Sequence, residues 1–227
     1  MDSAEEVVTA SVVGHRAVDE LPDELIDRWQ SRAEPGHDQG EIYWHILLGD
    51  DPHVHALAAE AQRRLASFGG LHMTPQRWLH MTTLVVGSTD EIAEHQMTAM
   101  TEQAAKLLSR VDPITVTLGR ILYHPEGIVL GTQPADTLTP VLHAVQTATR
   151  NATGYQGRIS GSTPWIPHVT ICYSTSRQPA EPIIKALGHE LPSRQVRVSA
   201  VSLVVQRGPE RLWDWHPYAT AQLRTNT

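Results

Sequence analysis

Residues 78–87, WLHMTTLVVG, and residues 165–174, WIPHVTICYS, carry the same order of side chains. Each stretch begins with Trp, passes through His, one apolar residue and Thr, and continues with apolar residues. Short runs rich in β-branched residues favour strands, in which alternate side chains share one face. Each stretch is therefore predicted to be a strand that presents an imidazole beside a hydroxyl on the same face.

The two His-x-Thr triplets exceed what composition alone explains. With 13 His and 21 Thr in 227 residues, chance gives about one such triplet, whereas the chain has three. The triplet at 72–74 runs directly into Pro75 after a Gly-Gly pair, so we interpret it as a loop and as the chance match. The triplets at 80–82 and 168–170 lie at equivalent places in a repeated strand and helix pattern. They are predicted to face each other across one cleft.

The rest of the chain alternates between helix and strand patterns. Helices are predicted at 21–32, 52–68, 90–109, 139–151 and 182–190. Strands are predicted at 41–48, 78–86, 114–122, 127–131, 165–173, 196–206 and 211–223. The pattern indicates an α+β or mixed α/β fold with antiparallel strand pairs. We expect a linker at 31–40, an N-terminal extension at 1–40 and one domain at 41–227, with similar halves at 41–132 and 133–227.

Composition limits the classes of function. The chain is 41% hydrophobic and 19% charged, which is typical of a globular protein, and its longest apolar runs are far shorter than a membrane helix. The acidic N-terminus does not resemble a secretory signal, so we expect a cytosolic protein. The net charge of -7 disfavours a surface for duplex nucleic acid but is compatible with a local phosphate site.

Metal and thiol chemistry have weak support. The single cysteine, Cys172, excludes an internal disulfide and a multi-cysteine metal site, and we expect a buried, unreactive thiol. His53 and His55 flank the start of a predicted helix, and residues two apart on a helix do not share a face. We expect these two to be exposed rather than to bind a metal with His45. His45 is predicted to lie in the core or on the surface, or to contact substrate if it points into the cleft.

Other candidates have equally ordinary explanations. Trp78 and Trp165 precede the two motifs and either pack or stack on a nucleobase. Three arginines that could neutralise a phosphate are expected to be solvated: Arg77, Arg120 and Arg207. The chain has no Walker A, Gly-x-Gly-x-x-Gly or Gly-x-Ser-x-Gly sequence.

Residues 80–87, HMTTLVVG, and 167–174, PHVTICYS, resemble the paired His-x-Thr/Ser motifs of the 2H phosphoesterases, and within them the 2′-5′ RNA ligase-like proteins. The order of elements from 41 to 223 is also similar to this family. The stretches 43–45, YWH, and 213–215, WDW, resemble bacterial members more loosely. Many members that process RNA ends carry Arg soon after the second motif, where this chain has Tyr173 and Ser174.

The resemblance implies a bilobal α+β fold, with two pseudo-symmetric lobes of mainly antiparallel sheet and outer helices around a central cleft. It implies a metal-independent phosphodiesterase that acts on 2′,3′-cyclic or 2′-5′-linked nucleotides or RNA ends, with no cofactor. We expect a monomer without duplex nucleic acid or membrane partners.

Imidazole suits the two proton transfers of this reaction. The predicted catalytic residues are His80 as acid, His168 as base, and Thr82 and Thr170 as hydrogen-bond donors to the phosphate. The predicted substrate contacts are His45, Trp78, Trp165 and Tyr173. Two alternatives stay open: a non-catalytic nucleotide- or RNA-binding module on the same fold, and a phosphoester cyclase or hydrolase of small-molecule metabolism.

Overall fold

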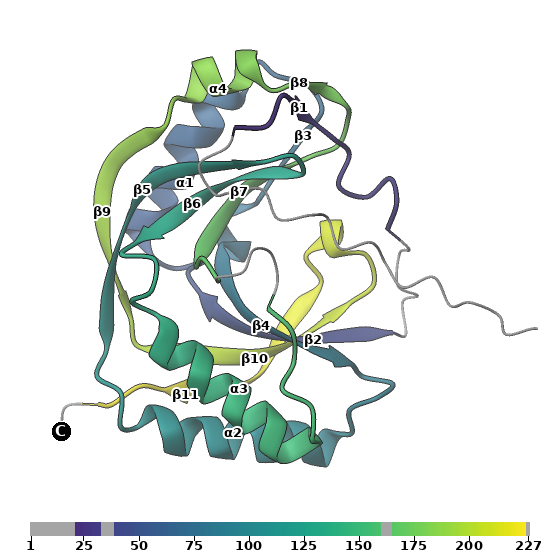
Figure 1. The fold of residues 1–227 in the computed structure, drawn as a ribbon, viewed down its shortest axis with the longest axis vertical. Helices are drawn as coiled ribbons and strands as arrows, with labels where there is room; N and C mark the ends of the chain where they lie inside the picture. Colours follow the sequence, from purple (N-terminus) through teal and green to yellow (C-terminus); the bar gives the residue numbers. More distant parts are fainter. Residues whose placement is uncertain (1–20, 33–38, 160–164, 226–227) are drawn as a thin grey trace, which may run out of the picture.

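The computed structural model describes residues 21–32, 39–159 and 165–225. The described part of the chain has two large antiparallel sheets and a small two-stranded one, and helices pack against both large sheets (Figure 1). The helices are α1 (Pro52–Leu65), α2 (Glu94–Leu108), α3 (Thr139–Thr153) and α4 (Glu181–Leu187), with short 3-10 turns η1 (Gln76–Trp78) and η2 (Glu210–Leu212). None of the described helices has both the length and the apolar character that a membrane crossing requires.

The four-stranded sheet has the order β11-β10-β2-β4, and the five-stranded sheet has the order β3-β7-β6-β5-β9. The strands are β2 (Gly40–Leu47), β3 (Leu71–Met73), β4 (His80–Ser88), β5 (Ile114–His124), β6 (Gly127–Gln133), β7 (His168–Ser174), β9 (Glu190–Val198), β10 (Ala200–Arg207) and β11 (Trp215–Gln222). Helices α2 and α3 contact the first sheet, and α1, joined by α4, contacts the second. The predicted α+β fold with antiparallel sheets is confirmed.

Each sheet takes strands from both halves of the sequence. In the four-stranded sheet, β2 and β4 precede residue 133 and β10 and β11 follow it, and the five-stranded sheet is mixed in the same way. The two lobes are therefore not the two sequence halves. The first motif starts β4 in one sheet and the second motif starts β7 in the other, and these two strands contact each other.

Helix α1 illustrates how local sequence sets an element. The Asp51 carboxylate accepts hydrogen bonds from the backbone N–H groups of His53 (2.8 Å) and Val54 (3.0 Å), and Pro52 occupies the first turn. Such a cap satisfies the free donors at a helix start. A buried stripe fixes the inner face of the helix: Val54, Leu57, Ala58, Ala61 and Leu65.

The prediction of a helix at 21–32 is wrong. This segment contains β1 (Glu24–Leu25), which pairs with β8 (Gln178–Pro179), followed by turns. Two of its backbone donors bind other segments: Ile26 N–H donates to the Pro125 carbonyl at 2.8 Å, and Arg28 N–H donates to the Ser174 carbonyl at 3.0 Å. Tertiary hydrogen bonds therefore override the apolar spacing. Most of the predicted linker, residues 33–38, lies outside the described residues.

One loop prediction and two strand predictions also need correction. Residues 72 and 73 are not in a loop, because Leu71–Met73 forms β3 and pairs with β7. The predicted strand 196–206 is two strands in different sheets, β9 and β10, separated at Ser199. The predicted strand 211–223 begins only at Trp215, after the η2 turn. A continuous apolar run does not reveal a change of sheet, and three residues are too few for a periodic pattern.

Candidate active site

The two motif histidines are held in the same way. The His80 Nδ1 lies 2.6 Å from the Trp78 carbonyl oxygen, and the His168 Nδ1 lies 2.7 Å from the Ile166 carbonyl oxygen, each two residues earlier in the chain. A carbonyl can only accept, so Nδ1 carries the proton and Nε2 has the free lone pair in each neutral ring. In both rings, Nε2 can therefore accept a hydrogen bond from a further partner.

The strands present these side chains in matched positions. In β4, His80 and Thr82 are half-buried while Met81 is buried, and β7 repeats this pattern at His168, Val169 and Thr170. The predicted sharing of one face within each motif is therefore consistent with the burial pattern. The segment that leads into β7 also bonds to β4, because the Trp165 indole N–H donates to the Thr82 carbonyl oxygen at 3.3 Å.

Burial and charge act on both imidazoles. Burial lowers the pKa of His80 below its usual value and the nearby charge of His168 lowers it further, although the Trp78 carbonyl and Glu210 oppose this shift. Burial also lowers the pKa of His168, with a smaller contribution from the guanidinium of Arg28. The strands that begin with these two histidines, β4 and β7, contact each other.

Tyr173 lies on the same face of β7 as the second motif because the pairing of this strand is irregular. The pairing of β7 with β6 shifts between Ile128 and Val129, and beyond this point Cys172 is buried while Tyr173 is half-buried. The shift breaks the strict alternation, so Tyr173 lies with Thr170 instead of opposite to it. Burial raises the pKa of Tyr173, and the charge of Arg28 and the Thr170 hydroxyl are among the groups that oppose this shift.

His45 packs against the histidine of the first motif. It pairs with Thr82 across β2 and β4, it is 3% exposed, and its ring centroid lies 4.2 Å from that of His80. Tyr43 stacks on its other side at 5.1 Å. Burial lowers the pKa of His45 well below its usual value, and the charge of His80 adds to this effect. His45 is therefore a neutral ring that packs against His80.

Two tryptophans that the sequence did not single out as site residues border the motifs. The Trp215 ring lies edge-on to His80 at 5.6 Å and to Trp78 at 4.7 Å between ring centroids. The Trp213 ring lies 6.3 Å from His80 and stacks on Tyr173 at 5.7 Å. Trp213 thus connects the neighbourhood of the first motif with that of the second.

A guanidinium from the N-terminal segment also reaches the site. The Arg28 side chain lies over the Tyr173 ring, with Cζ 4.2 Å from the ring centroid. It donates to both carboxylate oxygens of Glu210, at 2.9 and 2.7 Å, and to Glu126 at 2.9 Å. Arg28 therefore ties the hairpin turn between β5 and β6 to the turn between β10 and β11. No short motif in the sequence marked this cluster, because its members are far apart in the chain.

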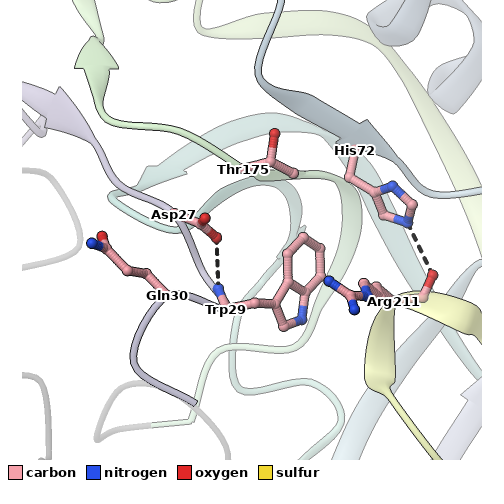
Figure 2. Close-up of a pocket in the computed structure, with 6 residues that line it drawn as sticks. All are labelled: Asp27, Trp29, Gln30, His72, Thr175 and Arg211. Carbon is pink, nitrogen blue, oxygen red and sulfur yellow. Dashed lines mark hydrogen bonds between the residues drawn. The ribbon is translucent and has the colours of Figure 1, made fainter. Parts of the chain in front are cut away.

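A pocket of about 360 Å³ lies beside the motifs. Figure 2 shows Trp29 between Asp27 and Gln30 on one side and His72 and Arg211 on the other. No motif residue lines it, but Trp29 contacts Tyr173 at 5.6 Å and His72 at 5.5 Å between ring centroids. The pocket is therefore a neighbour of the motif site.

The remaining candidates lie elsewhere. His53 is exposed, and the His55 Nε2 bonds to the Gly49 carbonyl oxygen at 2.6 Å. Within 21–32, 39–159 and 165–225, no three His, Cys, Asp or Glu side chains gather as a metal site would need. Arg77, Arg120 and Arg207 are exposed, as predicted.

The prediction of a buried thiol at Cys172 is confirmed. Its side chain is fully buried, and burial raises the pKa of the thiol to about 12. A thiol with such a pKa stays protonated near neutral pH, and only the thiolate is a strong nucleophile.

Solved structures share this fold. TT0787 of Thermus thermophilus is 19% identical, with a TM-score of 0.62, and the match covers 82% of this chain and 100% of that one. E. coli LigT in its apo form is 15% identical, with a TM-score of 0.55 and coverage of 85% and 100%. LigT complexed with 3′-AMP is 14% identical, with a TM-score of 0.57 and the same coverage.

The sequence comparisons agree with the fold. No curated protein matches the chain. A sequence model of the 2′-5′ RNA ligase superfamily matches residues 50–210, which include both motifs and most of the two sheets. The chain therefore belongs to the 2′-5′ RNA ligase superfamily.

Proposed function

We propose that this protein is a metal-independent phosphodiesterase that opens 2′,3′-cyclic phosphates or cleaves 2′-5′-linked nucleotides by acid-base catalysis. The observation that carries the proposal is the matched pair of imidazoles. His80 and His168 each bind a carbonyl through Nδ1, they start strands that contact each other, and the charge of one acts on the other. Two oriented imidazoles are what a hydrolysis with two proton transfers requires.

The proposed reaction uses Nε2 of both rings. His168 takes a proton from a water molecule while the water oxygen forms a bond to phosphorus. His80 gives a proton to the departing ribose oxygen while the bond between that oxygen and phosphorus breaks. Each carbonyl bond at Nδ1 stabilises the ring when Nε2 gains a proton and fixes its orientation. Thr82 and Thr170 donate to the non-bridging oxygens, where negative charge increases in the transition state. Both proton transfers are then supplied by side chains without a metal ion.

The substrate is proposed to be a small nucleotide or an RNA end. The pocket beside the motifs, of about 360 Å³, is in the size range of small-molecule sites, and its Trp29 indole offers a surface for a base. LigT, which shares the fold, has been crystallised with 3′-AMP and with phosphate, and a protein described as a phosphoesterase shares it too. We place the nucleoside in this pocket and its phosphate between the two motifs.

The direct test is hydrolysis of the four nucleoside 2′,3′-cyclic phosphates in the presence of EDTA. The wild type is expected to hydrolyse at least one of them, whereas His80→Ala and His168→Ala lose at least about a thousandfold in kcat but still bind nucleotide. His143→Ala, at an exposed helical histidine, is the control. A wild type that binds nucleotides without turnover would support the binding module instead, and activity abolished by EDTA would contradict the metal-free mechanism.

The proposed setting is cytosolic, with the protein acting as a monomer on single nucleotides or RNA ends. The net charge of -7 supports a compact anion site rather than a surface for duplex nucleic acid. Sedimentation analysis and a duplex-binding assay test these two expectations.

A further inference from the structure

Two indole N–H groups beside His80 are buried and have no hydrogen-bond partner. Trp213 is 4% exposed and Trp215 is 7% exposed, and neither Nε1 atom has a partner in the structure. An unpaired buried donor is costly, because it loses its bond to water without gaining another. Three other tryptophans have a partner: Trp44 donates to the Thr149 hydroxyl at 3.1 Å, Trp29 to Glu210 at 3.3 Å and Trp165 to the Thr82 carbonyl at 3.3 Å.

The backbone that carries these indoles is also unfavourable. Trp213 has φ of 56°, in the left-handed region that bulky side chains rarely adopt. Among the described residues, every other residue with a φ in this region is a glycine. Hydrogen bonds hold the turn: Trp213 N–H donates to the Glu210 carbonyl at 3.1 Å, and Trp215 N–H donates to the Trp213 carbonyl at 3.0 Å. Strain of this kind persists where surrounding contacts impose it, and it is concentrated at functional sites.

The position of the indoles limits what they could bind. Their ring centroids lie 5.6 Å (Trp215) and 6.3 Å (Trp213) from that of His80, and Trp213 also stacks on Tyr173. A phosphate bonded to the His80 Nε2 would lie about 3 Å from that nitrogen, and both indole rings pack edge-on against the same imidazole. Indole N–H groups only donate, and they therefore suit an acceptor such as a phosphate oxygen.

The charges nearby favour neutral donors for this task. The cation closest to Tyr173, Arg28, is already bonded to two carboxylates, those of Glu126 and Glu210. A phosphodiester carries a single negative charge, and neutral N–H groups can stabilise it without a further cation.

We propose that Trp213 and Trp215 are phosphate-binding residues, whose indole N–H groups donate to the non-bridging oxygens of the substrate phosphodiester beside His80. This inference rests on the proposed function for the identity of the substrate, but it predicts anion binding on its own. It also accounts for the two unpaired donors, because in the unliganded protein they are held ready for an oxygen that only the ligand supplies.

The test replaces the N–H and keeps the shape of the ring. Each tryptophan is exchanged for 3-benzothienylalanine, in which sulfur takes the place of N–H, and Trp→Phe variants at the same positions provide a second measurement. We expect Trp213→benzothienylalanine and Trp215→benzothienylalanine to raise the Tm, because an unpaired buried donor is removed. We expect each to weaken the binding of inorganic phosphate and of a nucleoside 2′,3′-cyclic phosphate by about tenfold or more.

The matched control is Trp44→benzothienylalanine. This replacement breaks a satisfied bond to Thr149, so it should lower the Tm and leave phosphate binding unchanged. A lower Tm at Trp44 and a higher Tm at the two site tryptophans would distinguish a structural hydrogen-bond donor from donors that bind a ligand. A purely structural change at Trp213 or Trp215 would not weaken binding while raising the Tm.

The outcomes also separate this inference from the proposed function. If the wild type binds phosphate through the two indoles but hydrolyses no cyclic phosphate, the phosphate site stands and the reaction fails. If the wild type hydrolyses cyclic phosphates and both variants retain its KM and its phosphate Kd, the phosphate site is overturned. A lower Tm in the two site variants, or a wild type that does not bind phosphate, also overturns it.

Discussion

The ring centroid of His45 lies 4.2 Å from that of His80, and His45 is 3% exposed. A buried histidine packed against a motif histidine resists protonation, because burial and the charge of His80 lower its pKa well below the usual value. The unfolded chain takes up this proton below about pH 6.5, whereas the folded protein does not. The stability that depends on neutral His45 is therefore complete above that pH and is lost as the pH falls toward the folded-state pKa.

We expect His45→Gln to flatten the pH dependence of the free energy of unfolding between about pH 6.5 and about pH 5. Urea denaturation at a series of pH values measures this slope. His143→Gln, at an exposed helical position, should keep the wild-type slope. An unchanged slope in His45→Gln would show that His45 does not carry this pH dependence.

The rate of the proposed reaction should depend on pH in a bell-shaped manner, with its maximum on the acid side. One imidazole has to be neutral and the other protonated, and burial lowers the pKa of both His80 and His168. We expect the maximum of kcat/KM to lie below about pH 6.5, the usual histidine value. A kcat/KM that stays flat or rises through alkaline pH would rule out this pair as the acid and base.

The motif threonines should affect the rate more than the stability. Removing a hydroxyl that donates to the phosphate in the transition state is expected to lower kcat about a hundredfold in Thr82→Val and in Thr170→Val. Thr83→Val is a matched control on the same strand, because the Thr83 hydroxyl is buried and unpaired. We expect this control to retain kcat and to gain about 1 kcal/mol in the free energy of unfolding. Equal rate losses at Thr82 and Thr83 would assign the effect to the strand rather than to the phosphate contact.

Arg28 should contribute to stability in a pH-dependent way. Arg28→Met leaves the carboxylates of Glu126 and Glu210 without their partner, and we expect a loss of about 2 kcal/mol in the free energy of unfolding at neutral pH. Burial raises the pKa of Glu210, but the hydrogen bonds and charge of Arg28, together with Arg32 and Trp29, outweigh this and lower it below the usual value. The stabilisation is therefore present above about pH 4.5 and is lost as the pH falls through the folded-state pKa.

Chemical denaturation of the wild type and Arg28→Met at about pH 7 and about pH 3 measures this difference. Arg177→Met is the control, because Arg177 pairs with exposed Glu24 at the surface. A loss of stability that is equal at both pH values would mean that Arg28 acts by packing on Tyr173 rather than by charge.

The elements that follow a strict local pattern could be predicted from the sequence. The five apolar positions of α1 recur at helical spacing after an Asp-Pro start, and the hairpin of β5 and β6 follows from two apolar runs around a short turn. The half-buried positions of His80 and Thr82 follow from the alternation within one strand. In each case the signal lies within about fifteen neighbouring residues.

The predictions that failed concern features that depend on contacts with residues far away in the chain. The segment 21–32 has helical spacing, but its conformation is set by hydrogen bonds to Pro125 and Ser174. The ion pairs of Arg28 join residues 98 and 182 positions away in the chain. Trp213 adopts its left-handed turn within the η2 region, which an apolar pattern read as part of a strand. A single sequence carries no signal for such contacts, so sequence reasoning found the motifs and their nearest neighbours in the chain, together with His45, but not Arg28, Trp213 or Trp215.

The central claim is that His80 and His168 act together on one phosphorus. The most direct measurement is kcat for the hydrolysis of a 2′,3′-cyclic nucleotide by His80→Ala, His168→Ala and the double variant. Residues that act as one unit are not additive, so we predict that the double variant loses no more than about tenfold beyond the slower single variant. Losses that multiply in the double variant, or a single variant that retains the wild-type kcat, would contradict a shared phosphorus.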